Sequence, residues 1–151
     1  MLKDNSDIVK SLGYLALYAA YAEEAIDECI STLQRYQTDS PKNLSKFPTK
    51  QKINYIQEQI NLKPVTQELQ HFPSLLEHLI ELFEERNKII HGRIYGSLQG
   101  EADILRPGRP SGTEREITSG ELIDLANQFF SALNPLNQAA FHSFHRYLSN
   151  S

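Results

Sequence analysis

Residues 6–36 read SDIVKSLGYLALYAAYAEEAIDECISTLQRY, and they set the architecture of this chain. Apolar side chains recur in this stretch at alternating spacings of four and three residues, which is the period of one face of an α-helix. A helix of this length spans roughly 45 Å at 1.5 Å per residue. We therefore expect it to serve as a spine for neighbouring helices or as half of a dimer, with Ser6 capping its start. The apolar seam consists of Ile8, Leu12, Leu15, Ala19, Ala22, Ile26, Cys29 and Leu33.

Tyrosines form a second stripe on the same helix, so the helix is apolar on more than one face. They are Tyr14, Tyr18 and Tyr21. Aromatic side chains at helical spacing pack into a core or an interface more often than they stack on bases. The stripe therefore favours burial within the bundle or contact with a second copy of the chain.

Further helices are indicated by their start signals. Thr49 opens a short helix that ends near residue 60, and Ser74-x-x-Glu77 is a capping box that starts a longer one. Gly92 is a natural residue to follow the end of that longer helix.

The C-terminal part has two helical signals. Thr118-x-x-Glu121 is a second capping box, which begins a helix over the apolar residues that follow. Asn134-Pro135 fits an N-cap and the first position of a last helix over residues 135–148. A single helix kinked at Pro135 is the alternative.

Residues 93–118 differ in kind, because glycine and proline interrupt short apolar runs. A small hairpin of Arg93–Leu98 against Asp103–Arg106, followed by a loop, is the expected structure. The patterns together predict an all-α bundle of about five helices with a small hairpin or irregular insertion after residue 92. The length of 151 residues predicts a single domain over residues 1–151.

Composition limits the cellular setting. Cys29 is the only cysteine, so no intramolecular disulfide and no cysteine-based metal cluster can form. The apolar run of residues 12–22 is too short to span a bilayer, and no signal-like apolar run follows Lys3 and Lys10, which are interrupted by Asp4 and Asp7. We expect a soluble cytoplasmic protein without membrane association.

The charge is unevenly distributed. Residues 86–115 contain six basic and three acidic residues, a net charge of +3, which leaves −7 for the remainder of a chain whose total is −4. Such a window attracts a polyanion. The alternative is a solvated loop that happens to carry arginines. The basic residues are Arg86, Lys88, Arg93, Arg106, Arg109 and Arg115.

The most chemically capable segment is Arg86-Asn87-x-x-x-His91. Asn87 and His91 are four residues apart and share a helix face. Arg86 lies about 140° from His91 on an ideal helix, so the two converge only where the helix ends, and Gly92 supplies that end. The alternative is a surface arginine and a histidine that interacts with the helix C-terminus.

This segment resembles the Arg-Asn-x-x-x-His signature of HEPN domains (higher eukaryote and prokaryote nucleotide-binding), with Arg86, Asn87 and His91 at the motif positions. The layout is also similar, with a long first helix carrying an acidic pair, here Glu23 and Glu24. The resemblance implies a metal-independent endoribonuclease without a cofactor, typically a toxin or phage-defence effector that works as a homodimer. Some members have a tyrosine two residues after the histidine that a nucleotidyltransferase modifies. Arg93 stands there in this chain, so the resemblance does not extend to that regulation.

The chemistry of the residues agrees with this function. RNA is cut without metal when its 2′-OH attacks the adjacent phosphate, which needs a base, an acid and a cation for the phosphorane. Arg86 suits the phosphate, Asn87 can orient, and His91 can move a proton. Two motifs facing each other in a dimer would supply both acid and base. We expect the substrate-binding residues to be Lys88, Arg93, Tyr95 and Arg106.

Two other functions stay open at this point. One is a non-catalytic HEPN-like module that binds a nucleotide, RNA or a partner protein. The other is a plain helical interaction domain. His142 and His145 have a spacing that permits a metal, but no carboxylate completes the site. The expected partners are RNA, a second copy and a cognate antitoxin protein.

Overall fold

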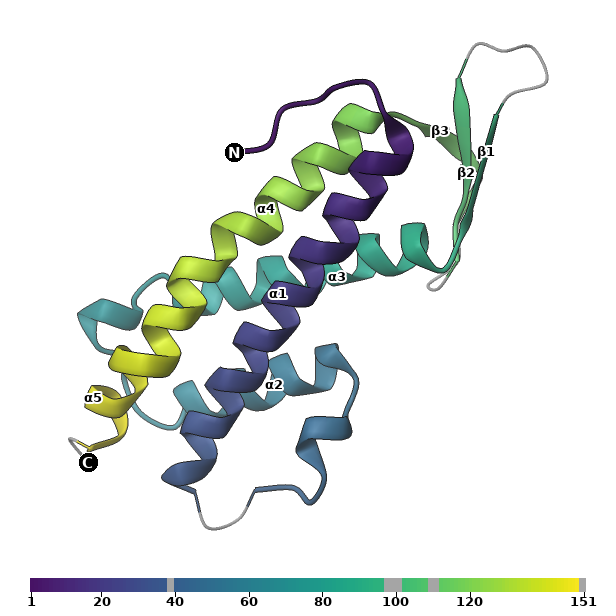
Figure 1. The fold of residues 1–151 in the computed structure, drawn as a ribbon. Coiled ribbons are helices and arrows are strands. Elements are labelled where there is room, and N and C mark those ends of the chain that lie inside the picture. Colours follow the sequence, from purple (N-terminus) through teal and green to yellow (C-terminus); the bar gives the residue numbers. More distant parts are fainter. Residues whose placement is uncertain (38–39, 97–101, 109–111, 150–151) are drawn as a thin grey trace. The chain divides into compact units, whose positions relative to one another are not determined.

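A computed structural model of the chain describes residues 1–37, 40–96, 102–108 and 112–149 (Figure 1). The structure is mostly helical and contains a small antiparallel sheet, which confirms the predicted helical class. None of the described helices is long and apolar enough to cross a membrane. In chain order the elements are α1 (Ile8–Arg35), η1 (Leu44–Lys46), α2 (Thr49–Ile60), η2 (Gln67–Leu69), α3 (Phe72–Ile90), β1 (Arg93–Gly96), β2 (Asp103–Arg106), β3 (Arg115–Ile117), α4 (Ser119–Gln138), η3 (Ala139–Ser143) and α5 (Phe144–Ser149).

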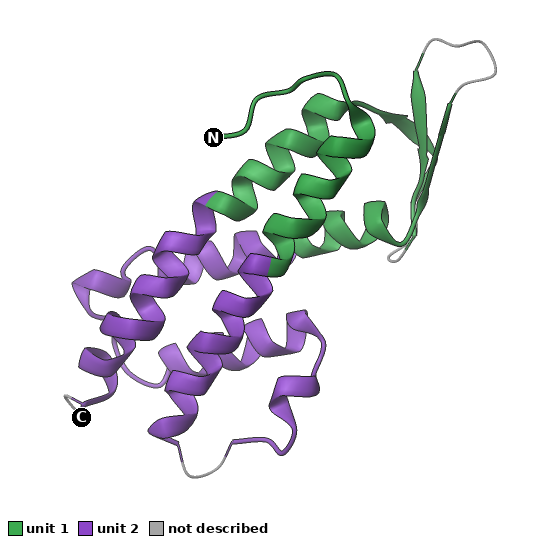
Figure 2. Cartoon of the chain, in the orientation of Figure 1, with its two compact units in different colours: residues 1–20, 81–130 green, residues 21–80, 131–151 purple. Residues whose placement is uncertain are grey.

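The chain forms two compact units, coloured separately in Figure 2. Unit 1 comprises residues 1–20 and 81–130, and unit 2 comprises residues 21–80 and 131–151. The long helices α1, α3 and α4 each contribute a segment to both units.

Unit 1 has a core in which helices and the sheet bury apolar side chains. The Phe83 and Phe129 rings lie 4.9 Å apart between their centroids and join α3 to α4. The N-terminal segment is tied down as well, because Asn127 exchanges two hydrogen bonds of 3.0 Å with the backbone of Leu2. The buried apolar residues of this unit are Leu15, Ala19, Leu82, Phe83, Ile89, Leu105, Ile117, Leu122, Ile123, Ala126 and Phe129.

Unit 2 confirms the predicted seam of the first helix. Every seam residue from Leu15 to Leu33 is buried, most of them in this unit. The Cys29 thiol donates to the Leu136 carbonyl at 3.4 Å, and burial raises the pKa of Cys29 to about 12. The thiol therefore stays protonated at neutral pH and packs as a small apolar group.

The helix starts agree only in part with the capping predictions. The Thr118 hydroxyl accepts a hydrogen bond from the Glu121 backbone N–H at 3.1 Å, which confirms that cap. The prediction for Ser6 was wrong, because Ser6 is left-handed at φ 62° and the Asp7 carboxylate instead accepts from the Lys10 N–H at 3.0 Å. The capping box beginning at Ser74 was also wrong, since α3 begins two residues earlier, at Phe72.

The prediction of a separate last helix that begins at Pro135 was wrong. Helix α4 continues through Pro135 to Gln138, followed by the π-helix η3 and then α5. Ala132 and Leu136 are both buried on either side of the proline, which holds the two parts in one helix. Proline has no backbone N–H to donate within a helix, and the π-helix begins four residues after Pro135.

The insertion after residue 92 is a three-stranded antiparallel sheet in the order β1-β2-β3. The predicted hairpin is confirmed for β1 and β2, while Leu98 at the end of its first strand lies outside the described residues. Strand β3 was not predicted. Leu105 and Ile117 are buried, so one face of the sheet belongs to the core of unit 1.

Candidate functional site

The sheet register gathers the predicted binding residues on one face. Arg93 pairs with Arg106 across β1 and β2, and Tyr95 pairs with Ile104. Because side chains alternate along a strand, Arg93, Tyr95 and Arg106 share the face opposite to buried Leu105. All three side chains are exposed. Directly opposed like charges destabilise a sheet, and Glu116, opposite Ile104, places a carboxylate on the same face.

The end of α3 is fixed by contacts with the loop after β2. The Gly108 N–H donates to the Lys88 carbonyl at 2.8 Å, and the His91 N–H donates to the Asn87 carbonyl at 3.0 Å. A Cβ on Gly92 would lie 2.4 Å from the Arg106 carbonyl oxygen at the end of β2. The two backbones therefore pass so closely that only glycine fits.

Gly108, in the loop after β2, is subject to the same steric limit. A Cβ on Gly108 would lie 2.4 Å from the carbonyl carbon of His91. Gly92 was predicted as the residue that follows the helix, and α3 ends at Ile90, just before it. Gly92 is not left-handed, so its requirement for glycine is space.

A hollow of about 380 Å³ lies where the helix end meets the sheet. Its lining residues are His91, Gly92, Arg93, Arg106 and Pro107. His91 is exposed and lines this hollow together with two arginines, a residue type whose guanidinium group binds phosphate oxygens in pairs. The structure thus brings together three of the predicted residues: His91, Arg93 and Arg106.

The other two motif residues lie one turn earlier and do not line this hollow. Arg86 is half-buried, with its guanidinium carbon 5.3 Å from the centroid of the Phe83 ring. Since Phe83 packs on Phe129 in the core, the guanidinium rests on a fixed support. Asn87 is also half-buried, and its carbonyl accepts the His91 N–H.

Two predicted binding residues are engaged with carboxylates. Lys88 forms an ion pair with Glu85 at 3.1 Å, which reduces its availability to a substrate. The Tyr95 hydroxyl donates to Glu114 at 2.8 Å, and this bond raises the pKa of Tyr95. Tyr95 is therefore held on the sheet face as a neutral phenol.

No protein-family model, curated protein or solved structure matches this chain.

The sequence interpretation missed Pro107 and Gly108, which complete the hollow and support the helix end. Their signal was present, because a Pro-Gly pair marks a tight turn. The sequence pattern could not show that this turn contacts the end of α3. Arg109, part of the basic window, lies outside the described residues.

One histidine of the other pair and one glutamate of the acidic pair have structural partners. His145 Nδ1 lies 2.7 Å from the Tyr36 hydroxyl, and the Glu23 carboxylate accepts from Thr49 at 3.4 Å. Within the described ranges, no group of three or more His, Cys, Asp or Glu side chains is placed to hold a metal ion.

Arg93→Ala and Arg106→Ala are each expected to weaken RNA binding. Each should also make the affinity less dependent on salt, by the amount that corresponds to the loss of about one phosphate contact. Fluorescence polarisation with a 2′-O-methylated RNA, titrated at several salt concentrations, measures both effects without cleavage. Arg115→Ala is the matched control, because Arg115 pairs with Glu121 at 2.6 Å and lies opposite Leu105. Equal losses in all three variants would show that the sheet face has no specific role.

Proposed function

We propose that this protein is a metal-independent endoribonuclease of the HEPN type. The observation that supports it best is the hollow in which exposed His91 meets Arg93 and Arg106 at the end of α3. A proton-transfer group beside two phosphate-binding cations is what cleavage by 2′-OH attack requires. Arg86 and Asn87, on the last turns of the same helix, complete the motif.

Each residue has a distinct role in this proposal. His91 moves the proton to or from the reacting oxygens, and Arg86 stabilises the phosphorane charge from its support on Phe83. Asn87 orients the imidazole or the phosphate. Arg93 and Arg106 hold a neighbouring phosphate, while Lys88 and Tyr95 contact the RNA at the margin of the site.

A single motif histidine in each chain, His91, supports a shared site in a homodimer, because the reaction needs both an acid and a base. Unit 1 also exposes apolar side chains that a second copy would cover. Leu17 is 43% exposed and Phe130 is 46% exposed, and the Phe130 ring lies 5.2 Å from that of Tyr18. We place the dimer contact on this surface of α1 and α4.

In the cell, an enzyme of this kind acts in the cytoplasm as a toxin or a phage-defence effector, held in check by an antitoxin protein. Expression without the antitoxin should stop growth, and His91→Ala should restore it.

The second candidate is a non-catalytic module that binds RNA or a nucleotide through the same hollow. The observation that favours this candidate is that two motif residues, Arg86 and Asn87, are not among the residues that line the hollow with His91. Such a module would retain RNA binding that depends on Arg93 and Arg106, and it would cut no RNA at any concentration.

Cleavage is expected to persist in excess chelator and to leave a 2′,3′-cyclic phosphate and a 5′-OH, because the nucleophile is the RNA's own 2′-hydroxyl. Mass spectrometry of the fragments identifies the ends, and a 2′-O-methyl group at the cleaved nucleotide should block the reaction. Chelator-sensitive cleavage with 5′-phosphate ends would end this proposal, whereas RNA binding without any cleavage would favour the binding module.

A further inference from the structure

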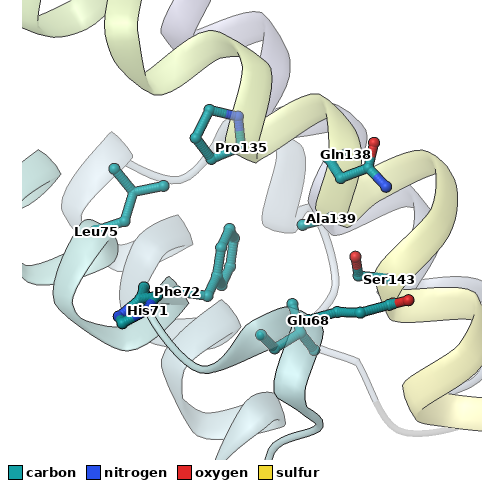
Figure 3. Close-up of a pocket in the computed structure, with 9 residues that line it drawn as sticks. Glu68, His71, Phe72, Leu75, Pro135, Gln138, Ala139 and Ser143 are labelled. Carbon is teal, nitrogen blue, oxygen red and sulfur yellow. The ribbon is translucent and has the colours of Figure 1, made fainter.

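Unit 2 contains a pocket of about 310 Å³ that is separate in residues from the site at the end of α3 (Figure 3). It lies between η2 with the start of α3 on one side and the end of α4 with η3 on the other. Its walls are mainly apolar, with a few polar groups among them. The lining residues are Glu68, Leu69, His71, Phe72, Leu75, Pro135, Gln138, Ala139 and Ser143.

The walls of this pocket are held by contacts outside it. The Phe72 ring packs edge-on against Phe144, with centroids 5.3 Å apart and the rings perpendicular. Glu68 is paired with Arg146, so the carboxylate at the margin already has a cationic partner. Leu69 is buried beneath the pocket. A pocket with fixed walls requires little ordering when a ligand enters.

One wall is the π-helix η3, an uncommon element that is frequent at functional sites. Thr32 fixes this segment, because its buried hydroxyl donates to the Ala140 carbonyl at 2.9 Å. Ala139 and Ser143 turn into the pocket from η3, and both are only 2% exposed. The small side chain of Ala139 leaves the space open, while Ser143 places a hydroxyl at the wall.

We propose that this pocket binds a small neutral aromatic molecule of one or two rings that carries one hydrogen-bonding group. The volume is at the lower end for ligand sites, which suits a compact molecule. The rings of Phe72 and Pro135 lie across the pocket from each other and offer flat apolar surfaces (Figure 3). The Ser143 hydroxyl supplies the polar contact. This binding activity lies beyond the proposed RNA cleavage and shares no residue with it.

Indole is the probe for this proposal, tested by nuclear magnetic resonance titration of the full-length protein. Amide shifts should centre on Phe72, Ala139 and Ser143, with a Kd on the order of 0.1–1 mM, as expected for a molecule of this size. Shifts that centre on other residues, or no shifts at millimolar indole, would overturn the proposal.

Leu75→Trp should fill the half-buried wall and weaken indole binding at least about tenfold. Leu62→Trp is the matched control, because Leu62 is 71% exposed and lies outside the pocket, and it should bind indole normally. Equal affinity in the two variants would overturn the proposal. Should Leu75→Trp fail to fold, the shift map of the unmodified chain decides.

Ser143→Ala separates the polar contact from the apolar one. It should weaken the binding of indole about fivefold, which corresponds to the loss of one hydrogen bond. The affinity for indene, which lacks the N–H donor, should stay unchanged. Equal losses for indole and indene would contradict the assigned role of Ser143.

Discussion

His91→Ala is expected to lower the rate of RNA cleavage by about 10²–10⁴-fold, the usual contribution of a positioned general acid or base. His91 is exposed at the end of α3, so its removal leaves no cavity and should change the stability of the fold by less than about 0.5 kcal/mol. The rate is measured on a short fluorescent RNA, and the fold is checked by thermal unfolding.

His78→Ala is the matched control, because His78 is also exposed and lies on α3, the helix that ends just before His91. It should cleave at the unmodified rate. A His91→Ala protein that retains both its fold and its full activity would exclude the imidazole from the chemistry.

Mixing the unmodified chain with His91→Ala tests whether the site is shared. In an equal mixture of exchanging subunits, a site that needs both histidines leaves about a quarter of the activity, whereas independent sites leave about half. The measured curve against mixing ratio is quadratic in the first case and linear in the second. A linear curve would exclude a composite site. The rate of the His91→Ala protein alone would still test whether His91 takes part in the reaction.

The helical part of the fold was predictable because long seams of period 3.6 average over many residues. The seam of residues 6–36 became α1 over Ile8–Arg35. Individual boundaries were harder, as Ser6 shows, because the cap moved one residue along to Asp7, whose carboxylate accepts from the Lys10 N–H. Strand β3 has only three residues, too few to show alternation, and its pairing with β2 is a long-range contact.

The candidate site was predicted as residue types, while its geometry depended on register. Arg93 and Arg106 are thirteen positions apart in the sequence, and only the pairing of β1 with β2 places them opposite each other. Gly108 could not be linked to His91 from the sequence, because that contact comes from the chain returning to the helix end. A motif shows which chemical groups are present, whereas the fold determines which of those residues lie close together.

Arg86→Lys is expected to lower the cleavage rate by about 10²–10³-fold, nearly as much as Arg86→Ala. Lysine retains the positive charge and can still rest on the Phe83 ring, from which the arginine lies 5.3 Å. It lacks the planar fork that holds two phosphate oxygens at once. Single-turnover cleavage at saturating protein isolates this loss from any change in binding.

Arg115→Lys provides the control for this substitution, because Arg115 is an exposed arginine of the same unit whose partner is Glu121 at 2.6 Å. It should cleave RNA at the unmodified rate. If Arg86→Lys also kept most of its activity while Arg86→Ala lost both activity and thermal stability, Arg86 would serve the fold by packing on Phe83. We would then assign the stabilisation of the phosphate charge to Arg93 and Arg106, which line the hollow with His91.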